Sequence, residues 1–135
     1  MSRAAVTVAG YMRKAERALD EARLLLRAEK TEGACNRAYY AMHDAAHAAL
    51  LATGHETPDA IIKTHNSLIA EFGKKLVLGG LIDAAFGRAF NKVQDMRQLA
   101  DYSAEPPPLD GAQGAVEQAD AFVAAIRSLI ARLKA

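Results

Sequence analysis

Three stretches of the chain repeat apolar residues at alternating spacings of four and three, which places those residues on one face of an α-helix. The stretches are residues 6–29, 81–103 and 110–133. In the first, the apolar stripe consists of Val8, Met12, Ala15, Leu19, Ala22 and Leu26. Charged residues occupy the other sides of that stretch. We therefore expect amphipathic helices that pack their stripes against one another.

A fourth stretch, residues 31–53, is apolar on almost every side. A helix of this kind is normally buried on more than one side. One face is apolar and is predicted to meet the core. The opposite face is rich in small residues and carries a tyrosine and one charge of each sign; it consists of Arg37, Tyr40, Ala41, Asp44 and Ala48. We expect this second face to be an interface with another copy of the chain or with a partner.

Turn-forming residues separate these helices. A shorter helix is expected to begin near Asp59 or Thr64 and to end at about Phe72. The glycine-bounded stretch 73–80 is expected to be irregular. The run Pro106–Pro108 ends the helix before it, because proline lacks the backbone N–H that a helix interior needs.

The predicted fold class is all-α, because no stretch alternates apolar and polar residues in the manner of a β-strand. We predict an antiparallel up-and-down bundle of four long helices with one additional short helix. The 135 residues, of which 51% are hydrophobic, suffice for one core, so residues 1–135 are predicted to form a single domain.

Charge and cysteine content narrow the class of function. Seventeen basic residues against sixteen acidic ones give a net charge of +1, which excludes a grossly basic nucleic-acid binder but not a local basic patch. Cys35 is the only cysteine, so no intrachain disulfide can form, as suits a reducing cytoplasm. There is no secretory apolar segment near the start and no run of about 18 apolar residues. We predict a cytoplasmic protein that does not interact with a membrane.

One candidate for metal chemistry is the pair His43 and His47, which are four residues apart with Asp44 between them. At this spacing both imidazoles can face one metal ion, as in zinc proteases. No third ligand follows at a familiar spacing. We therefore interpret the pair as lying at the edge of a helix interface, and we predict neither a metal nor another cofactor.

A second candidate is the stretch from Arg97 to Tyr102. Arg97 and Asp101 are four residues apart and share a helix face, so they can form an intrahelical ion pair. Tyr102 is predicted to point almost directly away from the apolar stripe. It is therefore available to a partner, a nucleotide or a modifying enzyme.

Three segments together resemble a known family. They are Asn36–Met42 (NRAYYAM), Lys63–Leu68 (KTHNSL) and Arg97–Tyr102 (RQLADY). Their order and spacing over nearly the whole chain resemble those of HEPN-domain proteins (higher eukaryotes and prokaryotes nucleotide-binding). The chain is similar to a prokaryotic subfamily whose genes often lie beside small nucleotidyltransferases. The resemblance implies a five-helix up-and-down bundle that is usually a homodimer.

The resemblance also implies a function. Many HEPN proteins are metal-independent endoribonucleases that use an arginine followed four to six residues later by a histidine. In some toxin–antitoxin pairs the nucleotidyltransferase silences the HEPN toxin by adenylylating a tyrosine just beyond that histidine. Here the motif begins at Arg97, but Asp101 holds the position of the histidine, while Tyr102 matches the tyrosine. A carboxylate is a poor replacement for an imidazole, which exchanges its proton near neutral pH. The remaining candidate imidazoles are His43 and His65.

The leading hypothesis is a dimeric HEPN protein that binds nucleotide or RNA and works with a nucleotidyltransferase in a toxin–antitoxin-like pair. One alternative is a metal-independent endoribonuclease toxin with the candidate catalytic residues Arg97, Asp101, His43 and His65. Another alternative is a helical interaction module without catalysis. The predicted binding site contains Arg37, Tyr40, Arg97, Asp101 and Tyr102, and Tyr102 is also the candidate for adenylylation. We expect Arg37 and Tyr40 to lie close to Arg97, Asp101 and Tyr102.

Overall fold

The computed structural model describes residues 6–134, and the chain in this range is helical. The elements are α1 (Val8–Arg27), α2 (Thr31–Ala52), α3 (His65–Glu71), the π-helix η1 (Phe72–Val77), α4 (Ala84–Tyr102) and α5 (Leu109–Lys134). Residues 6–134 contain no β-strand, and a single isolated bridge pairs Thr57 with Ala60. The prediction of an all-α fold is confirmed. None of the helices in this range is both long enough and apolar enough to cross a membrane.

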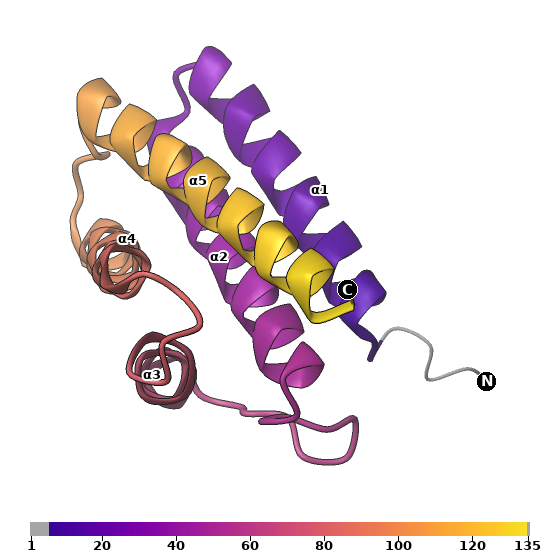
Figure 1. The fold of residues 1–135 in the computed structure, drawn as a ribbon. Helices are drawn as coiled ribbons and strands as arrows, with labels where there is room; N and C mark the ends of the chain where they lie inside the picture. Colours follow the sequence, from indigo (N-terminus) through magenta and orange to yellow (C-terminus); the bar gives the residue numbers. More distant parts are fainter. Residues whose placement is uncertain (1–5, 135) are drawn as a thin grey trace.

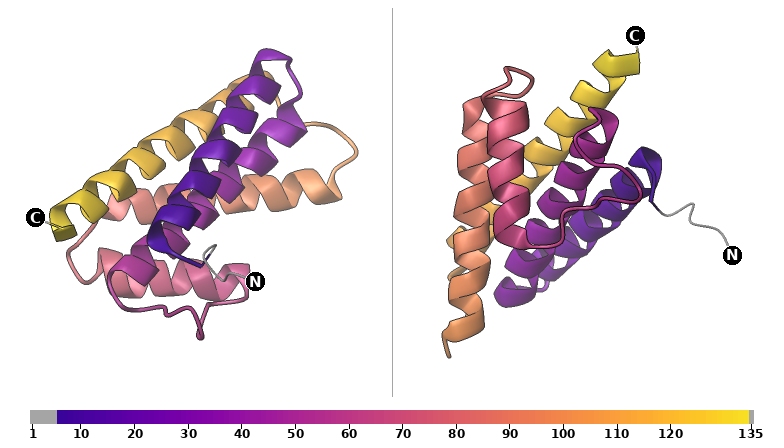
Figure 2. Two further views of the ribbon diagram at one scale, coloured as in Figure 1. Left: turned by 90° about the vertical axis from the view of Figure 1, so that its right-hand side faces the viewer. Right: turned by 90° about the horizontal axis from the view of Figure 1, so that it is seen from below.

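The helices form two groups that cross each other. In Figure 1, α1, α2 and α5 run along a common direction, with α1 antiparallel to α2 and α5 directed as α2 is. The same view shows α3 and α4 end-on, and the right-hand view of Figure 2 shows these two helices side by side. Because α4 crosses the other long helices, this arrangement does not confirm the expected antiparallel bundle of four long helices.

Helix α2 lies at the centre and contacts α1, α3, α4 and α5. Its second face is covered by the chain itself, since Ala41 and Ala48 are 0% exposed and Asp44 is 3% exposed. The prediction that these three residues contact another copy or a partner is therefore wrong. Arg37 and Tyr40, at the other end of that face, are half-buried and remain at the surface.

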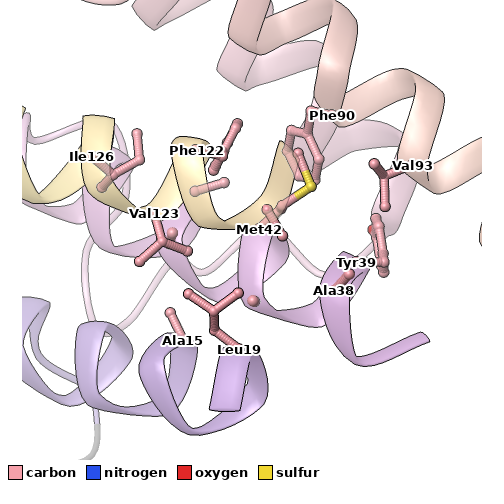
Figure 3. Packing of buried hydrophobic residues seen from close by; sticks show 14 of the residues in the cluster. Ala15, Leu19, Ala38, Tyr39, Met42, Phe90, Val93, Phe122, Val123 and Ile126 are labelled. Carbon is pink, nitrogen blue, oxygen red and sulfur yellow. The ribbon is translucent and has the colours of Figure 1, made fainter. Parts of the chain in front are cut away.

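Large aromatic side chains fill the space where the two groups of helices cross. The ring centres of Phe72, Phe90 and Phe122 lie 5.1 to 5.6 Å apart. Figure 3 shows Phe122 of α5 and Phe90 of α4 close to Met42 of α2. Such aromatic contacts supply much of the apolar area buried in a small domain. This core fixes α4 against α2.

The stretch 73–80 is not irregular as expected, because α3 continues into the π-helix η1. Leu78 donates its N–H to the carbonyl of Gly73 at 2.9 Å, five residues earlier. Phe72 and Leu76 are four residues apart and 0% exposed, so burial of both side chains favours a helical turn despite the glycine between them. Gly79 follows the wide turns, and a Cβ atom there would lie 2.3 Å from the carbonyl oxygen of Lys75. Only glycine fits that position.

Candidate functional site

Arg97 projects from α4 onto two tyrosine rings of α2. Its guanidinium carbon lies 4.8 Å from the ring centre of Tyr39 and 5.9 Å from that of Tyr40. Its Nε donates to Oε1 of Gln94 at 3.0 Å, and its Nη1 donates to Oδ2 of Asp101 at 3.1 Å. Cation–π contact and these hydrogen bonds hold the side chain in one orientation. Its remaining N–H donors have no acceptor within residues 6–134.

Arg37 lies on α2 at the other side of the same surface region. Its guanidinium carbon is 5.2 Å from the ring centre of Tyr40, and its Nη1 donates to Oε1 of Glu21 at 3.0 Å. A hollow of about 320 Å³ lies between α2 and α4, and Asn36, Arg37, Arg97 and Asp101 are among the residues that line it. The structure therefore brings Arg37, Arg97 and Asp101 to one hollow, with Tyr40 between the two arginines.

Tyr102 is placed differently. It is the last residue of α4 and is 89% exposed, and it does not line the hollow. The expectation that Tyr102 belongs to the same binding site as Arg37 and Tyr40 finds no contact in this structure to support it. Its exposure leaves the phenolic hydroxyl open to a modifying enzyme.

His65, the first residue of α3, is held by the buried Tyr39. The Tyr39 hydroxyl lies 2.6 Å from Nδ1 of His65. Burial is the main cause that raises the pKa of Tyr39, so this phenol keeps its proton and can donate a hydrogen bond to Nδ1. Burial also lowers the pKa of His65, with the neighbouring His43, Arg97 and His47 as smaller causes. The lowered pKa favours the neutral imidazole of His65, and a hydrogen bond from the Tyr39 hydroxyl to Nδ1 would leave the ring proton on Nε2.

His43 has a different partner. Its Nδ1 lies 3.1 Å from Oδ1 of Asp44, and the Asp44 side chain is almost fully buried. A carboxylate accepts hydrogen bonds, so Nδ1 of His43 is the donor in this contact. The His43 side chain is 21% exposed, and its ring centre lies 5.2 Å from that of His65. An imidazole oriented by a carboxylate is the usual arrangement of a general base.

His47 holds the loop between α2 and α3 in place. Its Nδ1 lies 2.9 Å from both carboxylate oxygens of Glu56, which is 2% exposed, and its ring stacks on Tyr11 at 5.1 Å. Glu56 also accepts the N–H of Ile62 at 2.7 Å. These contacts tie residues 53–64 to α2 and so place the start of α3. His47 is therefore a buried structural residue rather than a residue at an interface edge.

Burial is the main cause that raises the pKa of Tyr11, and the charges of Glu56 and Asp44 are smaller causes. Within residues 6–134, no three histidine, cysteine, aspartate or glutamate side chains are placed so that they can hold one metal ion.

Cys35 is buried, as is usual for a small core residue, and burial raises the pKa of its thiol.

The sequence pattern did not identify Tyr39, Glu56 or Gln94 as residues of this region. Tyr39 lies on the apolar face of α2 that was predicted to meet the core, and it is 0% exposed, but its ring and hydroxyl also contact Arg97 and His65. Gln94 occupies a buried position of α4 and binds Arg97. For Gln94, the one available signal in the sequence was a polar residue at a helical position that faces the interior.

Comparison with known proteins identifies the family. The family model for the HEPN domain matches residues 8–132. A relative from Thermotoga maritima named "UPF0332 protein" is 30% identical over 125 residues, which cover 92% of this chain and 91% of the relative. A relative from Methanocaldococcus jannaschii named "Putative toxin MJ0605" is 32% identical over 116 residues, which cover 86% of this chain and 83% of the relative. The chain therefore belongs to the HEPN-domain family.

Proposed function

We propose that this chain is the nucleotide- or RNA-binding component of a toxin–antitoxin-like pair, that it acts as a cytoplasmic homodimer, and that its partner is a nucleotidyltransferase. The observation that carries the binding proposal is the hollow between α2 and α4, which is lined by both Arg37 and Arg97. Membership of the HEPN family and the similarity to a relative named as a toxin support the wider role.

The two guanidinium groups suit a phosphate. Each presents planar N–H donors that match phosphate oxygens in a bidentate manner. Arg97 is well preorganised because its side chain is only 13% exposed and is packed on two rings. Each arginine also has a carboxylate beside it, Glu21 for Arg37 and Asp101 for Arg97. A phosphate must compete with these carboxylates, so binding should weaken with added salt.

Binding of ATP and of a short single-stranded RNA, measured by calorimetry and fluorescence anisotropy, tests this proposal. Arg97→Gln and Arg37→Gln should each weaken binding by about 10- to 100-fold, which corresponds to the loss of one charge-assisted hydrogen-bonding group. Arg127→Gln is a matched control, because Arg127 also pairs with a glutamate of α1, Glu16, but lies outside the hollow. If the wild-type protein binds neither probe, the chain is better described as an interaction module.

Endoribonuclease activity is a second candidate function, and the pairing of His43 with the buried Asp44 favours it. In this mechanism Nε2 of His43 takes the proton of a ribose 2′-hydroxyl, and the 2′-oxygen attacks the adjacent phosphorus. The bond to the 5′-oxygen breaks, and that oxygen is protonated by the imidazolium or by water. Arg97 stabilises the negative charge on the phosphoryl oxygens, and the neutral His65 donates a hydrogen bond from Nε2.

RNA cleavage in the presence of a metal chelator tests this second function. The expected products carry a 2′,3′-cyclic phosphate and a 5′-hydroxyl. His43→Ala should lower the rate by about 100-fold or more, as for the loss of a general base. His55→Ala is the control, because His55 is an exposed histidine of the loop after α2. Cleavage that survives both His43→Ala and Arg97→Ala would reject this site.

We propose further that the partner nucleotidyltransferase modifies Tyr102. The phenolic oxygen would attack the α-phosphorus of ATP, with release of pyrophosphate and formation of a tyrosyl-AMP ester. The 89% exposure of Tyr102 gives an enzyme access to it. Incubation with the nucleotidyltransferase and ATP, followed by intact-mass measurement, should show one added AMP in the wild type and none in Tyr102→Phe. An equal mass gain in the variant would identify a different residue as the target.

A further inference from the structure

An open groove of about 860 Å³ lies between the α3–η1 segment and α4. The right-hand view of Figure 2 shows the α3–η1 segment alongside α4, which extends beyond it. The volume is within the range of small-molecule sites, about 300–1,000 Å³. No residue of the hollow that contains Arg37 and Arg97 also lines this groove. The groove is therefore a separate feature of the surface.

The groove walls combine apolar and carboxamide side chains. Ile69, Val77 and Leu78 supply apolar surface, and the polar lining includes Asn66, Asn91, Gln94 and Gln98. A nucleobase likewise combines apolar and polar surface, because its flat faces are apolar and its edges form hydrogen bonds. Carboxamides offer both donors and acceptors, so they can pair with base edges.

The charges that line the groove favour an anion. Lys74 and Arg88 both line it, and neither has a hydrogen-bond or ion-pair partner elsewhere in the described part of the chain. Asp95 is the one carboxylate among the lining residues. Two unpaired cations beside one carboxylate attract the phosphates of a nucleic-acid strand more than they attract an apolar protein helix.

Gln94 supplies an unpaired donor at this groove. Its Oε1 accepts from Nε of Arg97, and because a guanidinium has no acceptor, the amide oxygen must face Arg97. The amide nitrogen Nε2 is then turned away, and it is buried with no hydrogen-bond partner. Gln94 is 3% exposed. A buried donor without an acceptor is unfavourable, and a base carbonyl or phosphate oxygen in the groove can supply the missing acceptor.

We propose that this groove binds a nucleotide of single-stranded RNA next to the phosphate site at Arg97. The proposal rests on the proposed function, and it specifies single-stranded RNA as the ligand of that site. Gln94 joins the two places, because it lines the groove and holds Arg97. A strand whose phosphate lies at Arg97 continues along α4 into the groove, where a base packs on the apolar walls and Lys74 and Arg88 meet the next phosphates.

One substitution can fill the groove and another can remove one of its positive charges, in both cases without disturbing the fold. A Cβ atom at Gly73 would meet nothing within 4 Å, so Gly73→Leu adds volume inside the groove. Gly114 of α5 is the matched control, because a Cβ there also meets nothing within 4 Å and Gly114 does not line the groove. Arg88→Gln is a second variant that changes charge at an exposed residue. Circular dichroism checks that each variant is folded.

The experiment measures the affinity of the full chain for a short fluorescent single-stranded RNA and, in parallel, for ATP. Gly73→Leu and Arg88→Gln should each weaken RNA binding by about tenfold, as for a lost base or phosphate contact, while ATP affinity stays at the wild-type value. Gly114→Leu should leave both affinities unchanged. Arg97→Gln should weaken both.

Other outcomes overturn the inference. If the groove variants bind RNA as the wild type does while Arg97→Gln does not, the groove is not part of the RNA site, and the proposed function stands. If the wild type binds ATP but not RNA, the groove is likewise not an RNA site, and the proposal of nucleotide binding stands. If Gly73→Leu alters only the oligomeric state, the groove is a contact between protein chains. If the wild type binds neither probe, the proposed function fails together with the inference.

Discussion

The buried pair of Glu56 and His47 is a direct test of how the loop between α2 and α3 is held. Glu56 accepts from two donors, the buried Nδ1 of His47 at 2.9 Å and the half-buried N–H of Ile62 at 2.7 Å. Glu56→Ala removes both acceptors and leaves the two donors without partners. The side chain of Glu56 is 0% exposed and that of His47 is 4% exposed, so water does not replace the lost contacts without local opening.

The magnitude follows from the burial of the pair. Two donors left without an acceptor, at about 1–3 kcal/mol each, cost about 2–6 kcal/mol in total. A small domain has a total stability of about 5–15 kcal/mol, so this one change should remove a large part of it. Urea denaturation followed by far-UV circular dichroism measures the loss.

Glu21→Ala is the control for this experiment. Glu21 also pairs with a cation, Arg37, at 3.0 Å, but the two side chains are 55% and 34% exposed. A surface pair of this kind contributes less than about 1 kcal/mol. The double variant His47→Ala/Glu56→Ala should be less destabilised than the sum of the two single variants, because the pair can be lost only once. A loss below about 1 kcal/mol for Glu56→Ala, or strict additivity, would refute this description of the loop.

Three further predictions concern the core, the π-helix and pH. Phe122→Ala should cost about 3–5 kcal/mol in urea denaturation, because this ring is 0% exposed in the aromatic cluster. Gly79→Ala should lower the melting temperature, since its Cβ would lie 2.3 Å from the carbonyl of Lys75, whereas Gly73→Ala, with nothing within 4 Å, should change it little. Burial, with the neighbouring His43, Arg97 and His47 as smaller causes, lowers the pKa of His65 in the folded state, so the unfolded chain binds that proton more readily. Stability should therefore fall as the pH drops below about 6.5, and His65→Gln should reduce the fall.

The helices were largely predictable because the apolar stripe of a helix is a local property of the sequence. Residues 81–103 were expected to be helical, and α4 runs from Ala84 to Tyr102. What surrounds a helix is not a local property. The sequence of α2 predicted burial on more than one side, but it could not distinguish burial by the chain's own helices from burial by a second copy. Ala41 and Ala48 are covered by the chain itself.

The stretch 73–80 shows a different limit. Its glycines favour an irregular backbone in isolation, since glycine loses more conformational freedom than other residues on entering a helix. In the fold, burial of Phe72 and Leu76 outweighs that cost, and the chain forms η1. The energy that decides this segment comes from contacts with residues distant in sequence, such as Phe90 and Phe122.

The proximity of Arg37 and Tyr40 to Arg97 was predicted from the faces of two helices, and the cation–π distances are in agreement. Tyr102 does not share that proximity, because it lies at the exposed end of α4. The three histidines near the site could be named in advance, but their roles could not. Those roles depend on which buried oxygen each ring faces: Asp44 for His43, Glu56 for His47 and Tyr39 for His65.

Tyr39 explains why the core and the candidate site are inseparable in this fold. Its ring is part of the core and lies 6.0 Å from that of Phe90, yet it also lies under the guanidinium of Arg97. Its hydroxyl lies 2.6 Å from Nδ1 of His65. A pattern of apolar and polar positions assigns such a residue to one class only. Because one buried phenol packs α2 against α4 and contacts the first residue of α3, it positions both the guanidinium of Arg97 and the imidazole of His65. The proposed phosphate site requires preorganisation of this kind.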